Sequence, residues 1–71
     1  MGQHWPSVKA RKLLAALLRI GWRVERIEGS HRILTREGYY CYVFAFHDAD
    51  EIPGLLVKKV ANATGLELED L

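Results

Sequence analysis

Residues 22–46, WRVERIEGSHRILTREGYYCYVFAF, alternate between strand-like segments and turns, and this alternation decides the fold. The predicted strands are Trp22–Ile27, His31–Thr35 and Tyr39–Phe46. In the first, Val24 stands between charged residues, as in a half-buried strand, and the third is rich in aromatic residues. Glu28-Gly29-Ser30 and Glu37-Gly38 have the composition of short turns. Three consecutive strands on short turns predict an antiparallel meander.

A helix is predicted before the meander. Its apolar residues recur at helical spacing; they are Ala10, Leu13, Leu14, Leu17 and Ile20. Ser7 is a favourable N-cap and Gly21 a favourable left-handed stop. We therefore expect this helix to run from about Val8 to Ile20.

A second helix is predicted after the meander. Pro53 suits a first helical turn, and Gly65 should end the helix near Ala63. The acidic tail Leu66–Leu71 has room for one more helical turn. The order helix, strand, strand, strand, helix predicts a single α+β domain over residues 1–71, with both helices on one face of a three-stranded antiparallel sheet.

The third predicted strand has two different faces, because alternate side chains of a strand point to opposite sides. One face holds Tyr39, Cys41, Val43 and Ala45, and the other holds Tyr40, Tyr42, Phe44 and Phe46. The smaller side chains suit packing beneath the helices, so we expect Cys41 to face the core and the four aromatic residues to form an exposed patch. Such a patch suits base stacking or a protein partner. A homodimer through the sheet face, or a helix that packs against this face, explains the same aromatic residues without RNA.

Charge is distributed unevenly along the chain, although the net charge is only +1. Residues 1–36 hold eight Lys/Arg and two acidic residues, and residues 37–71 hold two Lys/Arg and seven acidic residues. A basic half suggests an anionic partner such as a nucleic acid. The alternative explanation is that these charged side chains only contact solvent, on one helix and at two strand edges.

Several classes of protein are disfavoured by composition. The single cysteine, Cys41, excludes an intrachain disulfide. The longest apolar runs, Leu13–Leu18 and Tyr39–Phe46, fall short of the roughly 20 residues that a membrane span requires. No secretory signal pattern is present. We therefore expect a cytoplasmic protein that does not associate with a membrane.

Gly29-Ser30-His31 is the strongest candidate for a chemical site. Histidine is the side chain whose charge changes near neutral pH, and Arg26, Arg32 and Arg36 are close enough in sequence to hold an anion beside it. A turn histidine that hydrogen-bonds its own loop is the structural alternative. A metal site is disfavoured, because His31, His47, Cys41 and Asp48 match no zinc spacing, so no cofactor is expected.

These features occur in an order that resembles a known family. The landmarks are Gly21-Trp22, Arg26, Gly29-Ser30-His31, His47, Glu51-Ile52-Pro53 and Gly65-Leu66. From Ser7 to Leu71 the chain resembles the HicA-type mRNA interferase toxins. The resemblance implies a fold similar to a double-stranded-RNA-binding domain and a metal-independent endoribonuclease that cleaves mRNA. It also implies a cognate HicB-type antitoxin that covers the active face.

The resemblance places the family's catalytic histidine at His31, as a general acid or base. RNA supplies its own nucleophile in the 2′-hydroxyl, so one positioned proton-transfer group is enough to start cleavage. His47 and Ser30 are candidates for a second proton-transfer group or an RNA contact. The predicted RNA-binding residues are Lys9, Lys12, Arg23, Arg26, Arg32 and Arg36.

The chain departs from the family pattern at Glu28, where a lysine is common, and at Leu55-Leu56, which replace a Gly-Thr pair. Glu28 reduces the positive field beside His31. A non-catalytic RNA-binding module of the same fold is therefore the alternative function, in which the basic residues follow phosphates without strand scission. A protein-interaction domain is the third.

Overall fold

A computed structural model describes residues 4–71 and confirms the α+β class. Its elements are β1 (Val8–Lys9), α1 (Ala10–Arg19), β2 (Arg23–Glu28), β3 (His31–Thr35), β4 (Tyr42–Phe44), β5 (Glu51–Ile52), α2 (Gly54–Thr64) and a 3₁₀ turn, η1 (Leu68–Asp70). The antiparallel sheet has the order β2-β3-β4, and β1 pairs separately with β5. No helix in residues 4–71 is long and apolar enough to cross a membrane.

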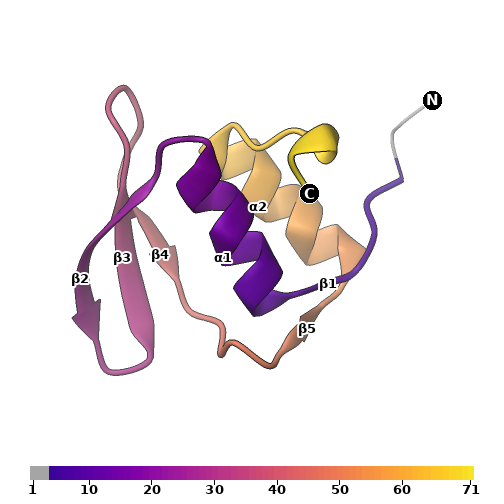
Figure 1. Ribbon diagram of the computed structural model, residues 1–71, viewed down its shortest axis with the longest axis horizontal. Helices are drawn as coiled ribbons and strands as arrows, with labels where there is room; N and C mark the ends of the chain where they lie inside the picture. The colour runs from indigo at the N-terminus through magenta and orange to yellow at the C-terminus, as the bar shows by residue number, and fades with distance from the viewer. Residues whose placement is uncertain (1–3) are drawn as a thin grey trace.

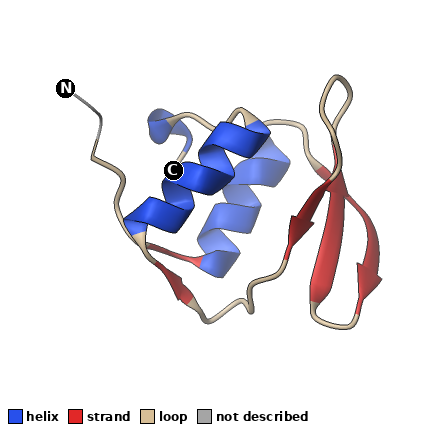
Figure 2. Ribbon diagram, turned by 180° about the vertical axis from the view of Figure 1, so that it is seen from behind, coloured by secondary structure: helices blue, strands red, loops and turns tan. Residues whose placement is uncertain are grey.

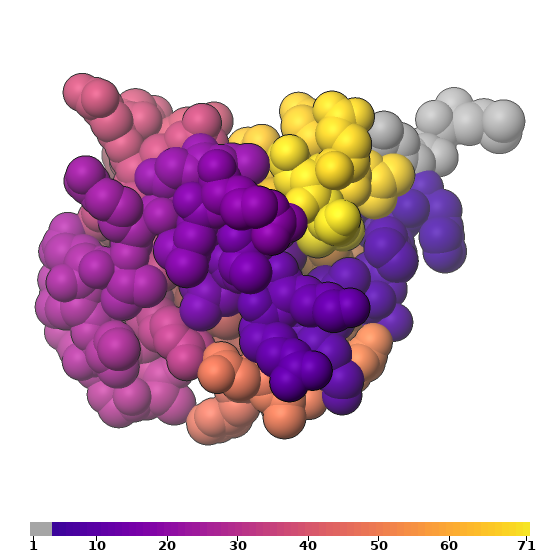
Figure 3. Space-filling view, viewed as in Figure 1, coloured from indigo at the N-terminus to yellow at the C-terminus, as the bar shows by residue number. Residues whose placement is uncertain are grey.

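Both helices pack on one side of the sheet, as predicted (Figures 1 and 2). The β2–β3 hairpin stands at the edge of the molecule, and its other face is left without a covering helix (Figure 1). In the space-filling view, α1 fills the centre between the hairpin and the C-terminal segment (Figure 3). The core joins apolar side chains of both helices to Leu34 and Phe44 of the sheet. The architecture thus leaves one sheet face open for a partner.

The first helix begins later than predicted. It starts at Ala10, and Ser7 is not its N-cap; Lys9 holds that position without a side-chain hydrogen bond. Val8 and Lys9 instead pair with β5, and this pairing keeps them extended. The N–H groups of Ala10 and Arg11 donate to the carbonyls of Asp50 at 2.8 Å and Asp48 at 3.2 Å. Backbone carbonyls from a distant loop thus replace the expected side-chain cap.

The β2–β3 hairpin forms at the predicted turn. Glu28 and His31 are directly paired, which leaves Gly29 and Ser30 as a two-residue loop. Gly29 has a φ of +62°, and no described residue other than glycine has a positive φ. A glycine with positive φ at the first loop position is the pattern of a type II′ turn, whose twist matches that of the strands. The loop chemistry therefore sets the register that places His31 first in β3.

The predicted aromatic patch is wrong. Phe44 is fully buried, and Tyr42 and Phe46 pack against the core, which raises the pKa of the Tyr42 hydroxyl by desolvation. Of the four residues, only Tyr40 is fully accessible, at 97% exposed. The reason is volume, because α1 presents small residues such as Ala10 and Ala16 to the core, and the sheet's large rings fill the remaining space.

The third strand is shorter than predicted. Its exposed face is the one with the smaller side chains, which was predicted to pack beneath the helices. Only Tyr42–Phe44 pairs with β3, because the chain turns after Arg36 and the Tyr39 N–H donates to the Arg36 carbonyl at 3.1 Å. The Tyr39 ring packs 5.4 Å from the Trp22 ring. Cys41 lies in the loop before β4 and is exposed, which contradicts its expected place in the core.

The second helix ends as predicted, in a left-handed Gly65 with a φ of +77°. One 3₁₀ turn follows it, as expected for the acidic tail. At the other end, Gly54 opens the helix beneath the backbone of Trp5, whose side chain packs against the core. A Cβ at Gly54 would overlap the Trp5 carbonyl oxygen, a backbone atom. Glycine is therefore required here for close approach.

Replacing Gly54 with alanine should destabilise the fold by about 1–3 kcal/mol, as overpacking does. Alanine normally stabilises a helix by up to about 1 kcal/mol relative to glycine, so the expected sign is reversed here. Asn62→Ala, at an exposed position of the same helix, is the control and should be neutral or slightly stabilising. Urea unfolding followed by circular dichroism measures both. A Gly54→Ala variant at least as stable as the parent would contradict the proposed contact.

Candidate functional site

His31 lies on the face of the sheet that the helices leave open. His31, Ile33 and Thr35 alternate with Arg32 and Leu34 along β3, and Leu34 is the residue in the core. We call the face of His31, Ile33 and Thr35 the outer face. Ile33 is only 7% exposed but lies outside the core cluster, and its cross-strand neighbour Val43 is 47% exposed. The outer face therefore combines a small apolar centre with an exposed imidazole at one end.

Two glutamates hold Arg26, which shares the outer face of the hairpin with His31. Arg26 donates from Nε to Glu28 at 2.6 Å and from Nη1 to Glu25 at 3.0 Å. The hydrogen bond to Glu28 and its negative charge raise the pKa of Arg26. Glu28 is also the cross-strand partner of His31. The field beside His31 is thus less positive than the count of arginines suggests, although exposed ion pairs of this kind are weak.

Ser30 and His47 meet at a small cavity beside the hairpin tip, away from the outer face. The cavity has a volume of about 250 Å³, and its lining residues are Ile27, Gly29, Ser30, Arg32, Phe46, His47 and Asp48. Arg32 shares a face with buried Phe44 and forms an ion pair with Asp48 at 3.0 Å. His31 and Arg32 therefore point to opposite sides of the sheet, and Arg32 is held by an acid.

A tight backbone turn positions His47. Its N–H donates to Asp50 Oδ2 at 2.9 Å, and its carbonyl accepts from the Asp50 N–H at 2.9 Å. The same loop supplies the carbonyls that cap α1. The His47 side chain is exposed. The turn thus fixes the backbone of His47 and leaves its imidazole accessible.

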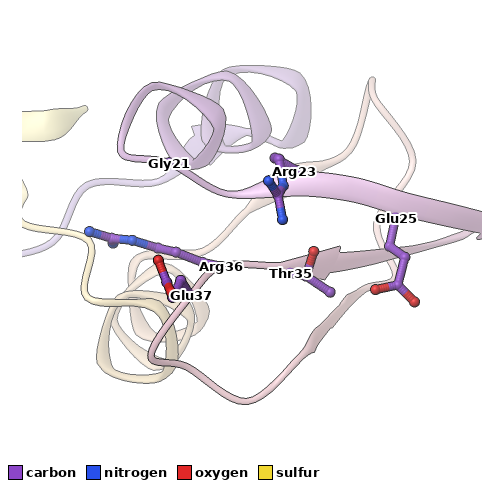
Figure 4. Close-up of a pocket in the computed structure, with 6 residues that line it drawn as sticks. All are labelled: Gly21, Arg23, Glu25, Thr35, Arg36 and Glu37. Carbon is purple, nitrogen blue, oxygen red and sulfur yellow. The ribbon is translucent and has the colours of Figure 1, made fainter.

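A groove larger than the cavity at the hairpin tip lies at the opposite end of the hairpin from His31. It has a volume of about 810 Å³, and its lining residues are Gly21, Arg23, Glu25, Thr35, Arg36 and Glu37. Arg23 and Thr35 are paired in register, and Arg36 follows β3 directly. Figure 4 shows the Arg36 side chain extending past Gly21, away from Arg23, with Glu25 farther along β2 toward the tip. These two predicted RNA-binding arginines therefore line one groove, with their side chains pointing in different directions.

The two predicted lysines lie elsewhere. Lys9 forms an ion pair with Glu51 at 3.8 Å, next to β5. Lys12 lines a separate cavity on α1 with Arg19 and Leu71. Within residues 4–71, no group of three or more His, Cys, Asp or Glu residues has a geometry that could hold a metal ion. The predicted site residues thus fall into separate locations and do not form one cluster.

Sequence reasoning missed the acidic partners of the arginines. The pairing of Arg26 with Glu28 had a visible signal, because residues two apart on a strand share a face. The pairing of Arg32 with Asp48 had none, since it depends on how the loop after β4 returns to the sheet.

Comparison with known proteins decides the family. The family model described as HicA toxin of bacterial toxin-antitoxin matches residues 10–66, most of the chain. The chain belongs to the HicA toxin family. Comparisons with curated proteins and with solved structures gave no match, so the expected likeness to a double-stranded-RNA-binding domain stays a prediction. As a HicA toxin, the chain is one component of a toxin–antitoxin system and implies a cognate antitoxin.

Proposed function

We propose that this HicA toxin is an endoribonuclease that cleaves mRNA, with His31 as the general acid or base. The observation that carries the proposal is an exposed imidazole at the end of an open sheet face, held by a two-residue loop. Membership of the toxin family supports it, because cleavage of mRNA is a direct route to toxicity. The antitoxin would then act by covering the outer face.

The proposed cleavage uses the RNA's own hydroxyl as nucleophile and involves no metal ion. The 2′-oxygen bonds to phosphorus while the bond from phosphorus to the 5′-oxygen breaks. One proton leaves the 2′-hydroxyl and one reaches the 5′-oxygen, so two proton transfers are needed. His31 carries out one of them. His47 and Ser30, which line the cavity on the opposite side of the hairpin tip from the outer face, are candidates for an RNA contact. They can serve the second transfer only if the RNA passes around the tip.

Six basic residues are proposed to contact RNA: Lys9, Lys12, Arg23, Arg26, Arg32 and Arg36. Lys9, Arg26 and Arg32 already form ion pairs with acids, so a phosphate must displace a carboxylate to bind them. The position of Glu28, between Arg26 and His31, favours the alternative of a non-catalytic RNA-binding module. In that case the chain binds RNA with strong salt dependence and leaves it intact.

RNA cleavage in the presence of a metal chelator separates the two functions. We expect the toxin, freed of its antitoxin, to cut an oligoribonucleotide under these conditions. An analogue with 2′-deoxyribose at the cleaved nucleotide should resist, because it lacks the nucleophile. Gel electrophoresis of end-labelled substrates measures both results. Intact RNA that is nonetheless bound would support the binding module, and cleavage of the deoxy analogue would contradict the proposed chemistry.

A further inference from the structure

We propose that Arg23 and Arg36 form a binding subsite for an RNA phosphate remote from the cleaved bond. The subsite is the groove at the end of the outer face opposite His31. The proposal rests on the proposed function, since it concerns how the same RNA strand is held. It assigns these arginines to substrate binding and not to the chemical step.

The charge state of the groove favours an anion. In the part of the chain that the structure describes, neither Arg23 nor Arg36 forms an ion pair. Glu25 is compensated by Arg26 at 3.0 Å, so Glu37 is the only groove acid without a basic partner among residues 4–71. The groove therefore contains two positively charged guanidinium groups and one carboxylate that has no basic partner among the described residues.

The geometry of the arginines suits phosphate. The Arg36 guanidinium lies 4.8 Å from the centre of the Tyr39 ring, an arrangement that supports the plane of the group and leaves its edge free to donate. Arg23 lines the same groove from the neighbouring strand, whereas the Arg36 side chain extends away from it past Gly21 (Figure 4). Planar forks of N–H donors match phosphate oxygens in pairs. Two such forks along one groove give the RNA backbone two groups to which a phosphate can bind.

The distance to His31 suits a single RNA strand. His31 and Thr35 share the outer face and lie four positions apart, or about 13 Å along an extended strand. Between them lies Ile33, which is almost fully buried, and beside it the half-exposed Val43 of β4 offers an apolar surface against which a ribose or a base can rest. An RNA strand cleaved beside His31 would thus present a phosphate a few nucleotides away to Arg23 and Arg36.

The double variant Arg23→Gln/Arg36→Gln tests the subsite on a longer oligoribonucleotide and on a dinucleotide. With the longer RNA, we expect KM to rise about 10- to 100-fold at an unchanged kcat. The logarithmic slope of binding against salt should become shallower by about 0.7 for each phosphate that the variant no longer neutralises. The dinucleotide, too short to reach the groove, should show no difference from the parent. Lys58→Gln/Lys59→Gln, which removes two exposed charges from α2, is the control and should leave KM unchanged.

The outcomes separate this proposal from the proposed function. If the parent toxin cuts RNA and the arginine variant keeps the parent KM and salt slope, the subsite is overturned and the nuclease stands. The subsite is also overturned if kcat falls without a rise in KM in a variant whose circular dichroism spectrum matches that of the parent. If no RNA is cut, fluorescence anisotropy on the same oligonucleotide measures binding directly. Weaker binding by the arginine variant alone then supports the subsite while the nuclease fails, and equal binding overturns both.

Discussion

Replacing His31 with alanine should reduce RNA cleavage by about 100- to 10,000-fold, the usual contribution of a positioned acid or base. The fold should survive, because the His31 side chain is exposed and makes no hydrogen bond to residues 4–71. Such surface changes usually alter stability by less than about 0.5 kcal/mol. Single-turnover cleavage of a defined RNA, with thermal unfolding of the same sample, measures both quantities.

The matched control is His4→Ala, which removes another exposed histidine. It should cut RNA at the parent rate. Added imidazole should partly restore cleavage by the His31→Ala variant if proton transfer is what the substitution removed. A folded His31→Ala variant that cuts as fast as the parent would remove His31 from the mechanism. The variant His47→Ala, assayed in parallel, tests the candidate for the second transfer.

Trp22→Ala should unfold most of the protein. Trp22 is 1% exposed, and its Nε1 donates to the Thr64 carbonyl at 3.0 Å. That carbonyl belongs to the last turn of α2, where helical partners are missing, so the indole caps the helix. Truncating a buried tryptophan costs about 3–5 kcal/mol, and the core of a chain this small supplies a similar amount. Circular dichroism at increasing urea concentrations measures the loss.

Trp22→Phe separates the hydrogen bond from the packing of the ring. It keeps an aromatic side chain but leaves the buried Thr64 carbonyl without its donor, which should cost about 1–3 kcal/mol. Tyr40→Ala, at the most exposed aromatic residue, is the control and should change the stability by less than about 0.5 kcal/mol. Equal stability of the Trp22→Phe variant and the parent would show that the cap contributes nothing.

The elements that sequence predicts best here are those with local causes. Gly29-Ser30 is a two-residue loop because its backbone conformation is available to glycine, and the strands pair in register from Glu28 and His31 as far as Arg26 and Ile33, where the register shifts. Gly65 ends α2 for a similar local reason. By contrast, the start of α1 depends on the pairing of Val8 with Ile52, far along the chain, and no local pattern reveals it.

The candidate site was predictable in its residues but not in its arrangement. Sequence pointed to His31 and to the surrounding arginines. It did not show that Asp48 engages Arg32, or that Arg23 and Arg36 share a groove. The exposed aromatic face was predicted incorrectly because strand periodicity defines two faces without saying which one the helices cover.

The sequence by itself determined the order of the two helices and the three strands between them, the hairpin that begins β3 with His31, and membership of the HicA toxin family. These depend on turn chemistry and short-range periodicity, which act within a few residues. Only the tertiary structure decided that Phe44 faces the core and His31 faces outward. That choice depends on volume, since the small residues of α1 leave space that the aromatic rings of the sheet must fill.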